Sequence, residues 1–234
     1  MNADETLNYT IPLEHIVLDG VSYNENYTNG QRRNLSLKLI NVKELSADGT
    51  KMTYKYLPHI DGLWYGTKIK YEQGVEYQGK EYYFSKGIYI IDNFDMQHTS
   101  SARDITYQCT DKFGYFEGAT GILESGYEIP VDTPIDEVVE GLLNLSCADG
   151  RVVDIKACII DSKYIDFKTQ STIRVGAGGT IGNLIEQLAT QMSAEYYYNA
   201  VGNLVLYPVD ESMNDVNKPI VWVYDENQMD GLSF

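Results

Sequence analysis

Basic residues are scarce in this chain. Its 234 residues include 18 Lys or Arg against 34 Asp or Glu, which gives a net charge of −16 at pH 7. Such a chain repels a nucleic-acid backbone unless a local basic patch overrides the overall field. The densest basic spots, Arg32 with Arg33 and Lys68 with Lys70, are too small for that and are typical of solvated strand faces. We therefore predict no stable binding to nucleic acid.

Long apolar runs are also missing. No stretch approaches the ~18 consecutive apolar residues that a membrane-spanning helix needs. The segment Met1–Thr10 is polar and acidic, and it lacks the basic start and apolar centre of a secretory signal. These absences predict a soluble chain that is made in the cytosol and does not enter a membrane.

Cysteine and histidine are too few and too scattered to indicate a metal site. The chain has three of each, without a CxxC pair, metal-type spacing or a GxSxG elbow. We predict reduced, mostly buried thiols and histidines of the surface or core. The cysteines are Cys109, Cys147 and Cys158, and the histidines are His15, His59 and His98.

Paired carboxylates are the remaining candidates for catalysis. A glycoside hydrolase needs two of them ~5 to 9 Å apart around a cleft, and nothing in the sequence places a pair in that way. We predict a solvated acidic surface with no catalytic, cofactor-binding or metal-binding residue, and no enzymatic activity. The pairs considered are Asp92 with Asp95, Asp132 with Asp136, and Glu76 with Glu81.

What the sequence does contain, from Ile11 to about Glu124, is strand alternation. "NLSLKLINV" directs Leu35, Leu37 and Leu39 to one face, and "TKMTYKYL" and "GTKIKYEQG" repeat the period of two, the latter with Ile69 and Tyr71 inward. The separators "ADGT", "HIDG" and "YQGK" supply the positive φ of tight hairpins. Six or more strands without a helix between them predict a barrel or sandwich.

The last of these strands form a longer hairpin. "EYYFSKGIYIIDNFDMQ" leads into "RDITYQCTDKFGYF", whose second strand carries Ile105, Tyr107 and Cys109 on one face. We expect that face to point into the core.

Beyond Glu128 the pattern becomes helical. "IPVDTPIDEVVEGLLNL" places Thr133 as N-cap and Pro134 at the first helical position, followed by acidic residues and an apolar stripe. The segment "GRVVDIKACII" then reads as a strand. The stripe consists of Ile135, Val138, Val139, Leu142 and Leu143.

A second copy of this arrangement follows about 46 residues later. Thr180 is the expected cap, Ile181 superposes on the first residue of the earlier stripe, and the strand "AEYYYNAVGNLVLYP" turns back through "NAVGN". The fold class is thus α+β, mainly β. We expect an N-terminal β-barrel-like domain over residues 1–125, an α/β domain with two helix-strand repeats over 126–210, and the start of a second barrel-like domain over 211–234.

The glycines before that second helix do not form a dinucleotide-binding loop. A GxGxxG fingerprint must follow a strand and lead to a parallel crossover. Here Ile181 stands where the third glycine belongs, and the next strand returns as a hairpin. We predict no phosphate or cofactor role for Gly176, Gly178, Gly179 and Gly182.

Tyrosine is abundant, with 20 residues. Its apolar ring and polar tip suit half-buried strand faces, subunit interfaces and sugar stacking alike, so composition leaves these alternatives open, with core and interface favoured. The strand tyrosines are Tyr54, Tyr56, Tyr71, Tyr77, Tyr82, Tyr83, Tyr89 and Tyr107.

Several longer segments resemble those of a known family. "KGIYIIDNFDMQHTSSARDITYQCTDKFGYFE" resembles the strand pair of tail-hub proteins in phages and related contractile particles. "TPIDEVVEGLL", "GTIGNLIEQLATQMSAEYYYNAVGNLVLYP" and "VWVYDENQMDGLSF" resemble the segments that follow in prophage hub proteins of Gram-positive hosts. The resemblance covers about Gly87 to Phe234.

This resemblance implies a trimeric baseplate hub in the virion tail. In that family, two barrel-like domains per chain present six similar units to a hexameric tail tube, and a spike or cell-wall hydrolase attaches on the distal side. The family is structural, so it assigns no catalytic residue. Because the chain stops soon after the expected first strand of the second barrel, we expect a truncated or shortened relative, whose ring formation is open.

The alternative is a carbohydrate-binding or glycoside-cleaving module of a phage or cell-surface system. It would use exposed tyrosines together with Trp64, Tyr65 and nearby acidic residues. Such a module requires a concave aromatic strip with convergent carboxylates, whereas a hub requires surfaces for neighbouring copies.

Overall fold

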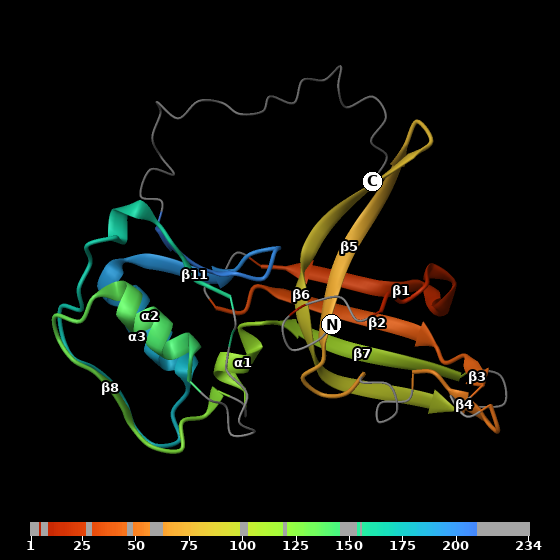
Figure 1. Cartoon of the computed structure of the whole chain (residues 1–234), viewed down its shortest axis with the longest axis horizontal. Coiled ribbons are helices and arrows are strands. Elements are labelled where there is room, and N and C mark those ends of the chain that lie inside the picture. The colour runs from red at the N-terminus through yellow and green to blue at the C-terminus, as the bar shows by residue number, and fades with distance from the viewer. Residues whose placement is uncertain are drawn as a thin grey trace.

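A computed structural model describes residues 5, 9–26, 30–45, 49–56, 63–98, 103–118, 121–145, 154 and 156–209. The protein is mainly β, and a curled antiparallel sheet is joined to a smaller α/β portion (Figure 1). The strands are β1 (Ile16–Glu25), β2 (Arg33–Ile40), β3 (Lys43–Leu45), β4 (Met52–Tyr54), β5 (Lys68–Tyr77), β6 (Lys80–His98), β7 (Arg103–Asp111), β8 (Tyr127–Ile129), β9 (Ile159–Ile160), β10 (Ile173–Val175), β11 (Ala194–Tyr198) and β12 (Leu204–Pro208). The α-helices are α1 (Gly114–Glu117), α2 (Ile135–Leu143) and α3 (Ile181–Met192).

The main sheet has five strands in the order β1-β2-β7-β6-β5. Its core face follows the predicted alternation: the leucines of β2 are buried, and the second strand of the long hairpin buries Ile105, Tyr107 and Cys109. Ile69 and Tyr71 pack against this core from β5. These predictions of strand face are confirmed.

Three irregularities curl the sheet. The register shifts between Ile16 and Val21 in β1, between Ile91 and Asn93 in β6, and between Tyr71 and Glu72 in the β5–β6 pair. Bulges of this kind bend a strand and increase its twist. The expected barrel-like domain is accordingly a half-barrel, in which the outer strands β1 and β5 do not pair with each other.

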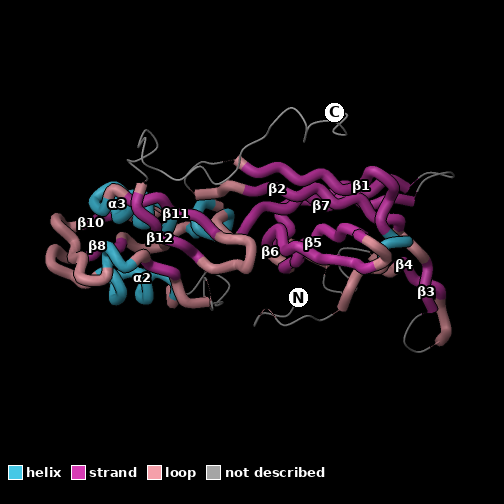
Figure 2. The backbone as a smooth tube through the Cα atoms, turned by 90° about the horizontal axis from the view of Figure 1, so that it is seen from above, coloured by secondary structure: helices cyan, strands magenta, loops and turns pink. Residues whose placement is uncertain are grey.

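The α/β portion lies beside one end of the sheet (Figure 2). Its core unites α2 and α3 with β8, β10, β11 and β12. Helix α3 begins as predicted, because Thr180 Oγ1 accepts the N–H of Asn183 and the Asn183 side chain accepts the N–H of Thr180. The apolar stripes of both helices are buried, and α3 leads directly into the hairpin β11–β12.

The predicted cap of the first helix is wrong. Pro134 is the N-cap of α2 and has an extended backbone, whereas Thr133 donates its hydroxyl hydrogen to the carbonyl of Pro130 at 2.7 Å. Pairing fixes this geometry, since Pro134 bridges to Lys168 and the N–H of Ile135 donates to Phe167. The proline therefore ends an extended segment instead of opening the helix.

Two predicted strands are shorter in the structure. Of "TKMTYKYL" only β4 is a strand, and it pairs with β3 alone. Of "GRVVDIKACII" the strand is β9, which pairs in parallel with β12. Residues 150–153 and 155, as well as Cys147, His59 and the expected second barrel start at 211–234, lie outside the described residues. Within the described part, no helix is long and apolar enough to span a membrane.

Candidate interaction site

A groove of about 990 Å³ lies on the open side of the half-barrel. Its floor is apolar, with Val21 from β1, Leu35 and Leu37 from β2, and Ile69 and Tyr71 from β5. Segment 9–13 forms a further part of the wall. The groove is thus the unfilled interior of an incomplete barrel, bounded by two strands that have unpaired edges in the described sheet.

The hairpin β5–β6 extends one wall of the groove. Its turn is formed by Gln78 and Gly79, both with positive φ of 53° and 71°, as the "YQGK" motif predicts. Where the hairpin leaves the sheet, Lys86 has no cross-strand partner and Gly87 has a φ of 140°. A side chain at Gly87 would also meet the ring of Tyr89, so glycine permits this bend.

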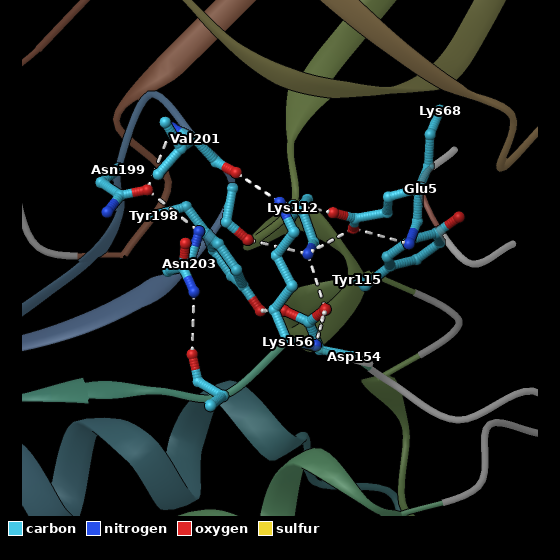
Figure 3. Close-up of polar contacts among 12 residues, drawn as sticks. Glu5, Lys68, Lys112, Tyr115, Asp154, Lys156, Tyr198, Asn199, Val201 and Asn203 are labelled. Carbon is cyan, nitrogen blue, oxygen red and sulfur yellow. Dashed lines mark hydrogen bonds and ion pairs between the residues drawn. The ribbon is translucent and has the colours of Figure 1, made fainter. Parts of the chain in front are cut away.

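A charged cluster lies at the junction with the α/β portion (Figure 3), and three of its members, Glu5, Lys68 and Lys156, line the groove. The carboxylate of Glu5 lies 2.9 Å from Lys68 Nζ, 2.6 Å from Lys112 Nζ and 2.9 Å from Lys156 Nζ. Lys112 Nζ also donates to Asp154 Oδ1 at 2.6 Å. We call these five residues the lysine cluster.

The side chains of Glu5, Lys112 and Asp154 are buried, those of Lys68 and Lys156 are partly exposed, and the charges of the cluster depend on each other. Burial alone would raise the pKa of Glu5, but the three ammonium groups outweigh it and lower that pKa to about 2. Burial lowers the pKa of Lys112 against the opposing pull of Asp154 and Glu5. Removing one partner would leave an uncompensated buried charge, which is strongly destabilising.

Tyr198 connects this cluster to the core of the α/β portion. Its hydroxyl donates to Asp154 Oδ2 at 2.6 Å, and burial raises its pKa well above the usual value. The Lys112 ammonium group lies 5.0 Å from the centre of the Tyr198 ring, within range of a cation–π interaction. The lysine cluster and Tyr198 therefore form one polar network, which joins Lys68 of β5 and Asp154 to strand β11.

A second junction is built around Asp111 at the end of β7. Its carboxylate accepts the backbone N–H groups of Arg32, Arg33 and Phe113 at 2.8, 3.0 and 3.0 Å. Burial raises the pKa of Asp111 to about 6 in spite of these donors. The Arg33 side chain donates to the carbonyl of Tyr198 at 2.7 Å, so β2 is also tied to the α/β portion.

The glycine-rich segment before α3 packs as a turn. The backbone N–H of Asn183, in the first turn of α3, donates to Thr180 Oγ1. A Cβ at Gly179 would overlap the Val175 side chain, and one at Gly182 would lie 3.3 Å from the Phe116 carbonyl oxygen. Close packing thus accounts for Gly179 and Gly182, and Gly178 has a positive φ of 84°.

The histidines and cysteines stay scattered where the structure describes them. His15 Nδ1 lies 2.6 Å from the hydroxyl of the buried Tyr56. Burial raises the pKa of the Cys109 and Cys158 thiols to about 12. Among the described residues, no group of three His, Cys, Asp or Glu side chains could hold a metal ion.

Of the carboxylate pairs, the structure brings Glu76 and Glu81 to the groove. They stand directly opposite each other on β5 and β6, both exposed, so they lie on one wall and do not face each other across a cleft. The other two pairs are exposed and do not line the groove.

The aromatic residues named for sugar binding form a separate cluster. Trp64, Tyr65 and Phe94 have ring centroids 5.1 to 5.6 Å apart, with planes inclined at 43° to 82°. Rings at these angles pack on one another and do not form a flat platform for a sugar face. Neither Trp64 nor Tyr65 lines the groove that contains the glutamate pair.

Sequence reasoning missed the lysine cluster. Lys112 and Asp154 are 42 residues apart, and neither stands in a motif. One signal was available: the lysine follows Asp111 at the end of a strand whose alternation predicts burial. A charged residue at the end of a buried strand needs a partner.

Comparisons with known proteins gave structural similarities only. No protein-family model matches the chain, and no curated protein matches it. It is similar to the 43 kDa tail protein of prophage MuSo2 from Shewanella oneidensis, at 15% identity and a TM-score of 0.45 over 80% of this chain and 47% of that one. It is also similar to a tail protein from Neisseria meningitidis MC58, at 11% identity and a TM-score of 0.46 over 79% of this chain and 44% of that one.

A third similar structure is the Francisella PdpA-VgrG complex, at 13% identity and a TM-score of 0.44 over 88% of this chain and 26% of that one. The chain spans less than half the length of each of these three chains. At these identities the likeness extends to the fold alone.

Proposed function

We propose that this chain is a structural protein of a phage tail or tail-like particle, of the baseplate-hub type. The observation that carries the proposal is the open half-barrel, in which an apolar groove lies between two unpaired strand edges. Exposed strand edges and apolar surface favour pairing with another chain. A protein that works through subunit contacts needs such surfaces.

The finer assignment comes from the sequence resemblance. It places the protein at the junction between the tail tube and a distal spike or cell-wall hydrolase, as a trimer in the full-length protein and as part of the virion. The Gram-positive host and the lack of enzymatic activity stay predictions. Net charge supports the assignment, because an acidic chain repels the DNA that passes through a tail.

Native mass measurement of the purified chain at micromolar concentration tests this proposal. We expect concentration-dependent self-association, with a discrete assembly at the upper end of the range. A chain that stays monomeric and instead binds a soluble polysaccharide saturably would contradict the structural role and favour the carbohydrate-binding alternative.

A further inference from the structure

The outer part of the β5–β6 hairpin has no support from the rest of the sheet. Strand β6 pairs with β7 from Tyr89 onward, so among the described strands the ribbon Glu72–Ser85 pairs only with itself, and at its base the Ser85 hydroxyl donates to the carbonyl of Ala200 at 2.8 Å. Figure 1 shows this hairpin standing clear of the other elements. Isolated two-stranded hairpins are marginally stable in water. A ribbon of this length therefore gains stability from a surface that covers it.

The two faces of the ribbon differ chemically. The outer face carries Gln73, Val75, Tyr77, Lys80, Tyr82 and Phe84, and of these six Val75 alone lines the groove. The three aromatic residues are 62%, 46% and 56% exposed. This face combines a large apolar surface with one ammonium group, and it bears no carboxylate although the chain is strongly acidic.

The groove face carries the opposite charge. Glu76 and Glu81 are directly opposite each other, and like charges in that position destabilise a strand pair. The Tyr83 hydroxyl donates to Glu81 at 2.7 Å. Among the described residues, no cation forms an ion pair with either carboxylate. Below this pair lies the apolar floor of the groove.

We propose that the groove receives the hairpin of a second copy of this chain. The outer face of one hairpin packs on the groove face of the next, with Tyr82 and Phe84 toward the apolar floor and the Lys80 ammonium group near the glutamate pair. This inference rests on the proposed function and adds to it the contact surface. The contact offsets one of the two glutamate charges and covers the exposed rings of Tyr82 and Phe84.

The occupant is a second copy because the two surfaces match each other within one chain. The outer face offers an ammonium group and aromatic rings, and the groove offers two carboxylates without an ion-pair partner among the described residues and an apolar floor, so the two surfaces are complementary in charge and in polarity. The two faces are different, so the contact is head-to-tail. Such a contact repeats to give a closed ring or an open filament.

Charge exchange across the contact tests this inference by analytical ultracentrifugation. Lys80→Glu and Glu81→Lys should each weaken self-association about tenfold, because each places like charges together. Mixing the two single variants should restore contacts between unlike copies, completely where the copies alternate and partly in a ring with an odd number of copies, where one mismatched contact remains. The double variant K80E/E81K should assemble by itself, since every contact then pairs a cation with a carboxylate.

Removal of the aromatic side chains should weaken self-association more than the charge changes do. Tyr82→Ser combined with Phe84→Ser should weaken self-association about 100-fold, as loss of interface aromatics does elsewhere. Tyr207→Ser is the matched control, because Tyr207 is 51% exposed on β12, away from the hairpin. The substituted side chains are exposed, so we expect all variants to fold. Circular dichroism checks this.

The outcomes separate this inference from the proposed function. A wild-type chain that assembles while Y82S/F84S assembles equally well overturns the hairpin contact and leaves the structural role in place. Loss of assembly in the single charge variants without recovery in K80E/E81K also overturns it. A wild-type chain that is monomeric at every concentration contradicts both the hairpin contact and the proposed function. Wild-type assembly that depends on the hairpin, together with recovery in K80E/E81K, supports the hairpin contact.

Discussion

The half-barrel and the α/β portion bury their apolar side chains in different ways. In the α/β portion, two helices cover two small sheets and enclose one core of 22 buried residues. In the half-barrel, one sheet curls round a smaller core and leaves a groove open. The first has a closed core, whereas the second leaves part of its apolar face open in the groove. Large exposed side chains accordingly gather on the hairpin of the sheet.

The strongest test of this difference is a cavity in the closed core. Leu184→Ala should lower the free energy of unfolding by about 3 to 4 kcal/mol, because Leu184 on α3 is fully buried. Denaturant unfolding measures it. Leu18→Ala is the control, with a side chain that is 89% exposed on β1. Equal effects of the two substitutions would show that the α/β core is not closed.

The lysine cluster joins the two regions, and Glu5→Gln breaks it. The substitution should cost about 3 kcal/mol at pH 7. Because the pKa of Glu5 is lowered in the folded protein from 4.5 to about 2, its contribution is present above pH 4.5 and is lost as pH falls toward 2.

The difference between wild type and E5Q in unfolding experiments should therefore shrink across that range. Glu14→Gln is the control, because it removes a carboxylate that is exposed and lies outside the lysine cluster. A cost of Glu5→Gln that is the same at pH 7 and at pH 2.5 would mean that the lysines do not hold Glu5 ionised.

The two helix starts give a smaller effect. Thr180→Ala removes the side-chain acceptor at α3 and should cost about 1 kcal/mol. Thr133→Ala should cost less, since its hydroxyl does not cap α2. Thermal unfolding of the two variants compares them directly. A larger loss of stability for Thr133→Ala than for Thr180→Ala would favour Thr133 as the N-cap of α2, as the sequence predicted.

The smallest expected effect lies on the hairpin itself. Glu76→Gln removes the like-charge pair and should stabilise the ribbon by about 0.3 kcal/mol in the unassembled chain. Hydrogen exchange of the amides of 72–85 reports this change. Glu72→Gln is the control, because Glu72 forms an ion pair with Lys70 at 2.7 Å, so its loss should give no protection.

Patterns of short period were predictable from the sequence. Alternation located the buried faces of β2 and β7, the apolar stripes located α2 and α3, and Gln78–Gly79 identified the hairpin turn, because each pattern reflects contacts between near neighbours. The capping box at Thr180 is local in the same sense.

Features that depend on distant partners were not predictable. The bulges at Asp92 and Lys86 have no local signature, so the sequence predicted a barrel without showing that it is half open. Pro134 behaves as an extended residue because Lys168 pairs with it. The lysine cluster brings together residues from four separate segments. Contacts between residues so far apart in the sequence are determined by the overall fold and have no local sequence pattern.

Three consecutive residues at the end of β7 face three different surroundings. Asp111 holds the backbone of β2, Lys112 belongs to the lysine cluster, and Phe113 is fully buried in the α/β core. The sheet and the α/β portion are therefore held together at three consecutive positions by three different kinds of contact: backbone hydrogen bonds to a carboxylate, a buried ion pair and apolar packing.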